Sequence, residues 1–395
     1  MNRKVLLLLL ALVVLMMGTA CSGGKEEGII SAQEWEKDHP DIYASYLKNN
    51  EMAATTYGAS EQIDYLEKYP YLNTLYDGNS FSIEYLRARG HTYALEDVVN
   101  SERPKPAASC LTCKTSGFLT ILEAQGVAGN ALKFEEVVNL EEMETISCYD
   151  CHKNEPGVLY VTREHLNVAV EGIGKEFKPE EMACAQCHVE YYLDPESKVV
   201  IMPSVNGLNP EAMMAYYDDL GYSDWTHPVS GTPLLKVQHP EWETFQGSLH
   251  QGYGFTCVNC HMPDVESASG DVMPSHQWTS PLKNVEASCL TCHTKETSES
   301  MIAKVEGLQG RVEERMNETA LKIEALIQAL GEAQNSGVSE AVLTEARAKH
   351  RAAQWYWDFV FVENSEGFHN NPLSHKLLDQ AEQLTEEALT LLQGN

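Results

Sequence analysis

The sequence predicts an all-α fold with little β-structure, and two features of the chain indicate it. Residues 33–295 contain short helical stretches interrupted by frequent Pro and Gly, and their hydrophobic periodicity is weak. After His293 apolar residues recur every three or four positions, which is typical of amphipathic helices. We therefore expect an irregular helical core over 33–295 and a region of long helices over 296–395.

Three helices are predicted in the C-terminal region. The first carries an apolar stripe of Val305, Leu308, Val312, Met316, Ile323, Leu326 and Leu330. The second spans about 339–362 and the third about 372–392, where Pro372 lies in the first turn, as helix starts tolerate. Such stripes pack within the chain or form a dimer seam, and the sequence leaves both open. We expect these helices to pack on the core and to form the interface of a homodimer.

The first residues have the pattern of an export signal. Arg3 and Lys4 precede an apolar run over 5–17, which is too short to cross a bilayer. The mature protein is therefore expected on the extracytoplasmic face of the membrane or in the periplasm.

A cysteine follows the small residues that end at Ala20, and a Ser-Gly-Gly spacer follows the cysteine. This pattern predicts a lipoprotein-type signal peptide over 1–20, acylation of Cys21 and a lipid-anchored tether over 21–32. Ordinary signal-peptidase cleavage after Ala20 is the alternative.

The chain is strongly acidic. Its 395 residues contain 28 Lys and Arg against 58 Asp and Glu, which gives a formal charge of −30. A surface of this charge repels nucleic acid and anionic lipid headgroups, so neither is expected as a partner. A site for an anion must therefore be locally positive.

Ten of the 11 cysteines, all except Cys21, fall in CxxC pairs. The pairs are Cys110 and Cys113, Cys148 and Cys151, Cys184 and Cys187, Cys257 and Cys260, and Cys289 and Cys292. The residue that follows each pair is Lys114 in the first case and His152, His188, His261 and His293 in the other four. A CxxCH unit attaches a c-type haem through two thiols and supplies an axial histidine to its iron.

Three other interpretations of the cysteine pairs are weaker. Zinc ribbons use CxxC pairs but do not require a histidine directly after each pair. A thioredoxin-like motif explains one pair and not five. Disulfides suit an exported protein, but uniform CxxC spacing would close five small, strained loops. The pattern therefore predicts five covalently attached haems.

The first site is the unusual one, because Lys114 replaces the histidine. An amine binds iron only when it is neutral, which a buried site beside a metal cation enforces. Loss of function at this site is the alternative, but both cysteines remain. We expect the haem at Lys114 to keep an open side for a substrate. The other four haems should transfer electrons, and each of their irons should have two strong axial ligands. Ten of the 14 histidines remain as candidates for the four distal ligands, and counting does not choose among them.

Four further strings accompany these sites. They are Arg89-Gly90-His91, His188-Val189-Glu190-Tyr191-Tyr192, Lys236-Val237-Gln238-His239-Pro240 and His261-Met262-Pro263. Together with the lysine variant as the first of five sites, they make the chain from about residue 30 to its C-terminus resemble the cytochrome c nitrite reductase family. The resemblance implies six-electron reduction of nitrite to ammonium at the Lys114 haem, fed by four bis-histidine haems. It also implies a membrane-anchored multihaem cytochrome that oxidises quinol as the electron donor.

The resemblance also implies roles for individual residues. The open side of the Lys114 haem would be lined by Arg103, Tyr191 and His239, with Arg87, Arg89 and Lys105 as competitors for the place of Arg103. The distal ligands would be His276 for the second haem, His91 for the third, His369 for the fourth and His250 for the fifth. A calcium ion would be held by Glu190 and Gln238 through side-chain oxygens and by Tyr191 and Lys236 through carbonyls. His39, His165, His227, His350 and His375 are left without a predicted iron.

The chemistry that fits these residues needs a proton donor and a positive charge beside the substrate. We expect His239, in its cationic form, to donate protons, and Arg103 to provide the local positive field. Tyr191 would donate a hydrogen bond or a proton to reduced intermediates. Alternatives are an electron-transfer cytochrome without substrate turnover, a reductase of sulfite or hydroxylamine, and a haem-binding scaffold whose site has decayed.

Overall fold

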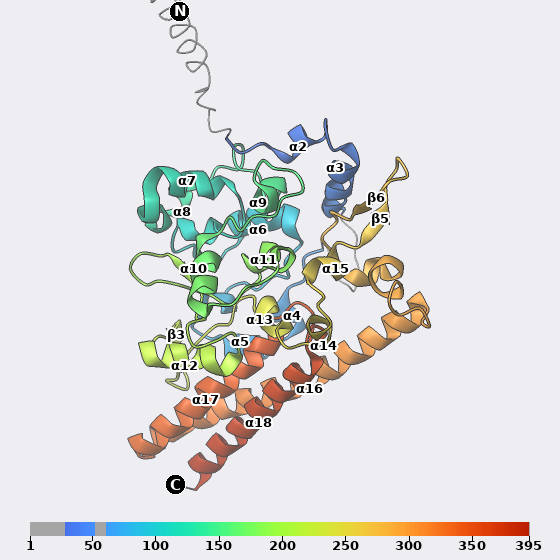
Figure 1. The fold of residues 1–395 in the computed structure, drawn as a ribbon. Coiled ribbons are helices and arrows are strands. Elements are labelled where there is room, and N and C mark those ends of the chain that lie inside the picture. The colour runs from blue at the N-terminus through green and yellow to red at the C-terminus, as the bar shows by residue number, and fades with distance from the viewer. Residues whose placement is uncertain (1–27, 52–60, 395) are drawn as a thin grey trace, which may run out of the picture.

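The computed structural model describes residues 28–51 and 61–394 of the chain (Figure 1). The predicted signal peptide, Cys21 and most of the predicted tether lie outside the described residues. The described chain begins beside the short helix α2 and ends at the tip of the long helix α18.

Short helices joined by loops make up the first three quarters of the chain. The part before the third CxxC pair contains α2 (Ala32–Trp35), α3 (Pro40–Leu47), η1 (Lys48–Asn50), α4 (Tyr65–Lys68), α5 (Leu72–Leu75), η2 (Ser80–Ser82), η3 (His91–Tyr93), α6 (Ala94–Asn100), η4 (Ala108–Leu111), α7 (Gly117–Gln125), η5 (Gly126–Ala131), α8 (Phe134–Val137), α9 (Cys148–His152), α10 (Glu164–Ile173) and α11 (Pro179–Ala185). The part after it contains α12 (Pro210–Leu220), α13 (Glu241–Phe245), α14 (Leu249–Gly252), α15 (Cys257–His261), η6 (Pro281–Lys283) and the π-helical turn η7 (Glu286–Leu290). Helices of one or two turns are not stable alone, so this region depends on packing.

Three small antiparallel hairpins are the β-structure of the described chain. β1 (Tyr192–Leu193) pairs with β2 (Val200–Ile201), β3 (Trp225–Thr226) with β4 (Pro233–Leu234), and β5 (Asp264–Glu266) with β6 (Val272–Pro274). Tyr192 lies opposite Ile201 in the first pair, and Trp225 lies opposite Leu234 in the second. The prediction of an all-α fold with little β-structure is confirmed.

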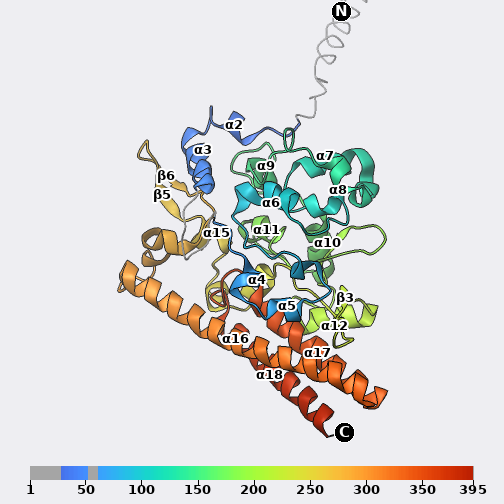
Figure 2. The same ribbon diagram turned by 180° about the vertical axis from the view of Figure 1, so that it is seen from behind.

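Three long helices, α16 (Ser298–Ser336), α17 (Glu340–Phe361) and α18 (Asn371–Gln393), form the C-terminal region. Figures 1 and 2 show them side by side along one edge of the molecule. Thr297 caps α16 in a capping box, Ser339 caps α17, and proline occupies the first turn of α18. Each helix agrees with its predicted position, and α16 extends beyond the stripe that predicted it.

The long helices share one hydrophobic core with the irregular region. Leu72 and Leu75 of α5 pack in the same buried cluster as Met316 and Ile323 of α16 and Trp357 of α17. Burial of this apolar surface is what joins the two regions. None of the described helices is both long and apolar enough to cross a membrane.

Candidate functional site

The CxxC units lie on or beside single helical turns, and two of these turns are capped by their own variable residues. In the second unit the Asp150 side chain accepts a hydrogen bond from Ser147 N, and in the fourth the Asn259 side chain accepts one from Thr256 N. These are capping boxes, which fix the turn that presents both thiols and the following histidine. The ten cysteines of the five units form no disulfides with one another, which leaves their sulfur atoms for haem attachment.

The variable residues of the first three units are connected through Thr162 and Arg163. Arg163 Nε donates to Thr112 O at 2.7 Å, and its guanidinium forms a buried ion pair with Asp150. Gln186 Nε2 donates to Asp150 O at 2.9 Å, and Gln186 Oε1 accepts from Thr162 N and Oγ1. Because Thr112, Asp150 and Gln186 lie inside the first, second and third units, one polar network holds three attachment sites together. We call it the 162–163 network.

The structure places each predicted distal histidine beside the CxxCH histidine with which it was paired. The ring centres are 5.7 Å apart for His91 and His188, 6.3 Å for His152 and His276, 6.1 Å for His261 and His369, and 6.5 Å for His250 and His293. Two imidazoles on opposite sides of one metal ion hold their ring centres about 6 Å apart, since each metal–nitrogen bond is about 2 Å. The four pairs therefore fit four bis-histidine haems.

Hydrogen bonds at Nδ1 leave Nε2 free for iron in several of these rings. The acceptors are backbone carbonyls for three rings: Val158 O for His152, Pro274 O for His276 and Thr279 O for His261, at 2.9–3.0 Å. Carboxylates contact the other two: Glu363 Oε1 lies 2.6 Å from His369 Nδ1, and Glu241 Oε2 lies 3.4 Å from His188 Nδ1. A bond at one ring nitrogen fixes the tautomer and the orientation of a ligating imidazole. Nδ1 of His91 is buried and has no partner among the described residues.

The predicted substrate side of the first haem brings Arg103, Tyr191 and His239 close to Lys114. The guanidinium of Arg103 lies 4.2 Å from the centre of the Phe81 ring. Its positive charge acts to lower the pKa of Tyr191, against the larger effect of burial. Burial raises the pKa of Tyr191, so its hydroxyl stays protonated and able to donate. Among the described residues, no carboxylate forms an ion pair with Arg103.

The competitors of Arg103 are engaged elsewhere. Arg89 forms ion pairs with Asp97 and Glu96. Lys105 Nζ donates to Ser101 O, and Arg87 Nη2 donates to Glu61 O at 3.3 Å. Of these four candidates, Arg103 is the one whose charge acts on Tyr191, and among the described residues it forms a hydrogen bond to Ser101 but no ion pair.

The imidazole of His239 is half-buried, and the sequence led us to expect a cationic ring. Burial lowers its pKa to about 4, and the nearby carboxylate of Glu241 opposes this effect. An anion bound beside the ring would favour the protonated form in the same way.

The predicted calcium ligands lie together between the loop after the third CxxCH unit and the segment after β4. Glu190 accepts hydrogen bonds from Gln238 N at 2.6 Å and Tyr217 OH at 2.9 Å, and Gln238 Nε2 lies 3.0 Å from Lys236 O. Burial raises the pKa of Glu190 to about 8, with Asp224 adding to the effect and these hydrogen bonds opposing it. A cation would stabilise this buried carboxylate in its charged form.

No group of three or more His, Cys, Asp or Glu side chains is arranged to hold a metal in 28–51 and 61–394. A site at Glu190 would therefore depend on carbonyl and amide oxygens, which are ordinary ligands of calcium. The oxygen donors predicted for this site, one carboxylate, one amide and two carbonyls, are therefore of the kinds that bind calcium.

The histidines without a predicted iron have other surroundings. His227 and His350 are fully buried, and both rings are hydrogen-bonded within the protein. His375 Nδ1 lies 3.2 Å from Arg315, and the ring of His39 lies beside that of Trp35. His165 keeps a buried Nε2 without a partner among the described residues.

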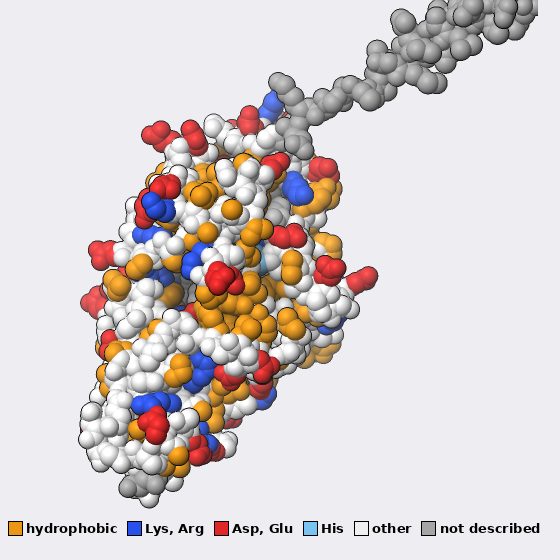
Figure 3. All heavy atoms as spheres, turned by 90° about the vertical axis from the view of Figure 1, so that its left-hand side faces the viewer, with side chains coloured by type: hydrophobic (Ala, Val, Ile, Leu, Met, Phe, Trp, Pro, Cys, Tyr) orange, Lys and Arg blue, Asp and Glu red, His pale blue; other side chains and the backbone are white. Residues whose placement is uncertain are grey.

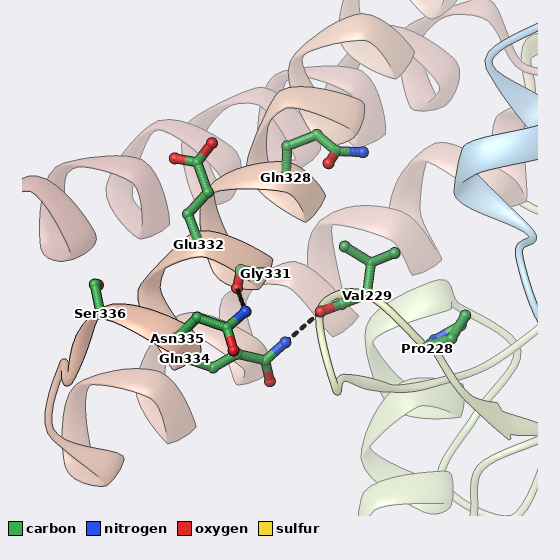
Figure 4. A pocket seen from close by; sticks show the side chains of 8 residues that line it. All are labelled: Pro228, Val229, Gln328, Gly331, Glu332, Gln334, Asn335 and Ser336. Atoms are coloured by element: carbon green, nitrogen blue, oxygen red, sulfur yellow. Dashed lines mark hydrogen bonds between the residues drawn. The ribbon is translucent and has the colours of Figure 1, made fainter.

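Two hollows in the described part of the chain are not lined by Lys114, Arg103, Tyr191 or His239. One of about 550 Å³ lies between the β3–β4 turn and the end of α16, where Gln334 donates to Val229 O (Figure 4). Its lining contains no cysteine or histidine, so it has no ligand for a haem. The other, of about 130 Å³, is lined by Cys260 and His261 and coincides with the fourth attachment site.

The face seen in Figure 3 carries a central patch of apolar side chains surrounded by scattered acidic and basic ones. No single charge covers this face. A locally positive site for an anion therefore has to come from individual residues such as Arg103.

Comparison with known proteins identifies the family of this chain. The model of the cytochrome c552 family matches residues 31–394. The cytochrome c nitrite reductase subunit NrfA of Nitratidesulfovibrio vulgaris Hildenborough is 30% identical to this chain over 405 residues, which cover 90% of this chain and 77% of that protein. The chain belongs to the cytochrome c nitrite reductase family. A solved member, the catalytic subunit from Desulfovibrio desulfuricans ATCC 27774 with two calcium sites, matches with a TM-score of 0.86 and 30% identity over 92% of this chain and 86% of that one.

Sequence reasoning missed three acidic residues around the haem sites of this family member. Glu241 and Glu363 contact predicted axial histidines, and Asp358 forms an ion pair with Lys236. Glu241 stands two residues after His239 and Glu363 six residues before His369, but an acid at either spacing is no signal by itself. Their roles follow from contacts that only the fold makes visible.

Proposed function

We propose that this protein is a five-haem cytochrome c that reduces nitrite to ammonium. One observation carries the proposal. Four attachment sites have a second histidine 5.7–6.5 Å from the motif histidine, whereas the Lys114 site has Arg103, Tyr191 and His239 beside it instead. Four sites are built to carry electrons and one is built to bind a small anion.

The residues present fit the five haems. The ten thiols would attach them, Lys114 and the four motif histidines would be the proximal ligands, and His91, His250, His276 and His369 would be the distal ones. When bound, the haems deliver electrons one at a time, and the iron at Lys114 offers an open coordination position. The conversion of nitrite to ammonium takes six electrons and eight protons, so the protein must also supply protons repeatedly.

Three side chains handle the substrate and its protons. Arg103 provides the positive charge that overcomes the acidic exterior and orients the oxygens of nitrite. His239 takes up a proton at its ring when the anion enters, and donates it to the oxygen that leaves as water. Tyr191 keeps its proton because of burial and donates a hydrogen bond to nitrogen-containing intermediates.

We assign a calcium ion to Glu190, Gln238 and the carbonyls of Tyr191 and Lys236. The relative from Desulfovibrio desulfuricans is described with two calcium sites. The raised pKa of Glu190 supports one such site here, as do the contacts that place Gln238 beside Glu190 and beside the carbonyl of Lys236. The ion would hold Tyr191 and the segment that carries His239 in position and would not react.

The cellular setting is also part of the proposal. The chain is exported, a lipid at Cys21 holds it at the extracytoplasmic face, and residues 21–32 act as a tether. A membrane-anchored multihaem cytochrome that oxidises quinol donates the electrons. Residues 33–295 form the haem-bearing core, and residues 296–395 form the helical region through which two copies associate. Size-exclusion chromatography with light scattering of the holoprotein tests the dimer.

The decisive experiment is steady-state turnover of the haem-loaded protein with nitrite and reduced viologen. We expect one ammonium per nitrite consumed, and a loss of about 100-fold or more in kcat for His239→Ala, since general acid catalysis is worth 10²–10⁴-fold. His375→Ala, which changes a histidine on α18 outside the site, is the matched control and should retain activity. No ammonium from the wild-type protein would overturn the proposal. An electron carrier would then show no turnover of nitrite, sulfite or hydroxylamine, whereas a reductase of another substrate would consume sulfite or hydroxylamine.

A further inference from the structure

The loop between α17 and α18 places a buried carboxylate directly on a predicted axial histidine. Glu363 Oε1 lies 2.6 Å from His369 Nδ1, and the Glu363 side chain is 2% exposed. His369 in turn lies opposite His261, the motif histidine of the fourth haem. Since His369 uses Nδ1 for Glu363, its Nε2 faces the iron position.

The same loop holds the carboxylate in place. Ser365 donates to Glu363 twice, from N to Oε1 at 3.2 Å and from Oγ to Oε2 at 2.5 Å. Ser365 Oγ also accepts a hydrogen bond from His369 N at 2.8 Å. Glu363, Ser365 and His369 therefore form one hydrogen-bonded unit within this loop, and Gln309 of α16 donates a further hydrogen bond to Ser365 O.

The surroundings of the other predicted axial rings are different. His152, His261 and His276 donate from Nδ1 to neutral backbone carbonyls. His188 has Glu241 at 3.4 Å, but Glu241 Oε2 has no aligned hydrogen bond among the described residues. Within the part of the chain that the structure describes, His369 is the predicted axial ligand with a short, direct bond to a carboxylate.

We propose that Glu363 is a positioning residue that lowers the reduction potential of the fourth haem relative to its carbonyl-bonded neighbours. A carboxylate on the far nitrogen of a ligating imidazole makes that imidazole more basic, and a more basic ligand favours the oxidised iron. Burial strengthens the effect, because the negative charge is poorly screened. The inference rests on the axial ligation proposed above but not on the identity of the substrate.

The test is a potentiometric titration of the fully haem-loaded protein without nitrite, followed by visible spectroscopy and by electron paramagnetic resonance of the low-spin haems. In Glu363→Gln we expect the equilibrium constant for reduction of one low-spin haem to increase about tenfold, which is about 59 mV for one electron. The g values of the same haem should change. Glu366→Gln is the matched control, since it removes the same charge three residues away with no contact to His369.

A second variant predicts a shift of opposite sign. Ser365→Ala removes the hydrogen bond from Oγ to Glu363 Oε2 and the one that Oγ accepts from His369 N, but leaves Glu363, His369 and the bond between them. Without this donor the Glu363 carboxylate becomes a stronger hydrogen-bond acceptor for His369 Nδ1. The reduction potential of the fourth haem should therefore fall. This variant also decides the question if Glu363→Gln loses the fourth haem, because its carboxylate remains.

Two results would overturn the proposal. One is a Glu363→Gln protein whose haem potentials equal those of the wild type or of Glu366→Gln. The other is a Ser365→Ala protein whose potential stays unchanged or rises. Failure of the proposed nitrite reductase activity would appear separately, as a wild-type protein that titrates normally but forms no ammonium.

Discussion

Lys236 Nζ lies 3.1 Å from Asp358 Oδ1, and this ion pair joins the segment that leads to His239 to the long helix α17. Both side chains are almost completely buried. Asp358 also accepts hydrogen bonds from Val237 N and from Tyr76 OH. One carboxylate on α17 thus fixes the backbone directly ahead of the proposed proton donor.

Replacement of Asp358 should therefore destabilise the protein. Asp358→Ala leaves the Lys236 ammonium buried without its partner, which costs about 3–5 kcal/mol. We expect a clear drop in Tm, measured by circular dichroism on the haem-loaded protein. Asp379→Ala is the control, because Asp379 is 69% exposed in its pair with Arg315, and surface pairs are worth about 0–1 kcal/mol. Equal drops in Tm for the two variants would contradict the prediction.

His350 should make stability depend on pH. Burial lowers its pKa to about 3 from 6.5, with His227 adding to the effect and Gln354 opposing it. Between these values the unfolded chain binds a proton that the folded chain does not, so stability falls as pH drops below about 6.5, by up to about 1.4 kcal/mol per pH unit.

Unfolding in denaturant at pH 7 and at pH 5 measures the contribution of His350. His350→Gln should lose less stability than the wild type between the two pH values, and His39→Gln should lose as much as the wild type. A His350→Gln protein with the full wild-type loss would refute this explanation.

Gly367 should not accept a side chain. Its φ is +86°, in the left-handed region that favours glycine, and a Cβ atom would lie 2.7 Å from Val312 Cγ2 of α16. In Gly367→Ala we expect the loop to shift, moving His369 away from His261, with a loss of about 1–3 kcal/mol and an altered low-spin spectrum of the fourth haem. Gly310→Ala, in α16 with no atom within 4 Å of the added Cβ, should instead be neutral or stabilising. A Gly367→Ala protein with an unchanged spectrum and Tm would disprove the predicted clash.

Removal of the Glu190 charge should release calcium. Glu190→Gln leaves the predicted site with only neutral oxygens, so we expect the calcium content of the dialysed holoprotein, measured by mass spectrometry, to fall by about one ion per chain. Asp194→Asn in the β1–β2 turn is the control and should keep its calcium. An unchanged calcium content in Glu190→Gln would exclude Glu190 as a ligand.

Much of this molecule could be predicted from its sequence because short local motifs encode the haem-attachment sites. The CxxC units predicted the attachment sites, and the three- and four-residue periodicity predicted the long helices. The pairs of axial histidines came from the family resemblance and stay predictions of ligation, to which the structure adds their spacing. The lowered pKa of His239 follows from burial, which the sequence does not display.

Contacts between distant segments could not be predicted. Lys236 and Asp358 are 122 residues apart, and no sequence pattern around either residue predicts their contact. Glu363 is close to His369 in the chain, but only the turn at Gly367 brings the carboxylate onto the ring. In both cases tertiary packing decides which of many acidic residues faces a particular cation or imidazole.

The 162–163 network has a consequence for the way the holoprotein is assembled. Thr112, Asp150 and Gln186 are held in one network by Thr162 and Arg163, so the geometry of each of the first three haem sites depends on the other two. A chain that lacks one of these three haems leaves Arg163 buried with part of its partners displaced, and the other two sites lose their common anchor. Cofactor loading in this half of the molecule should therefore be cooperative, giving mature protein and misassembled chains rather than a graded series of partly loaded forms.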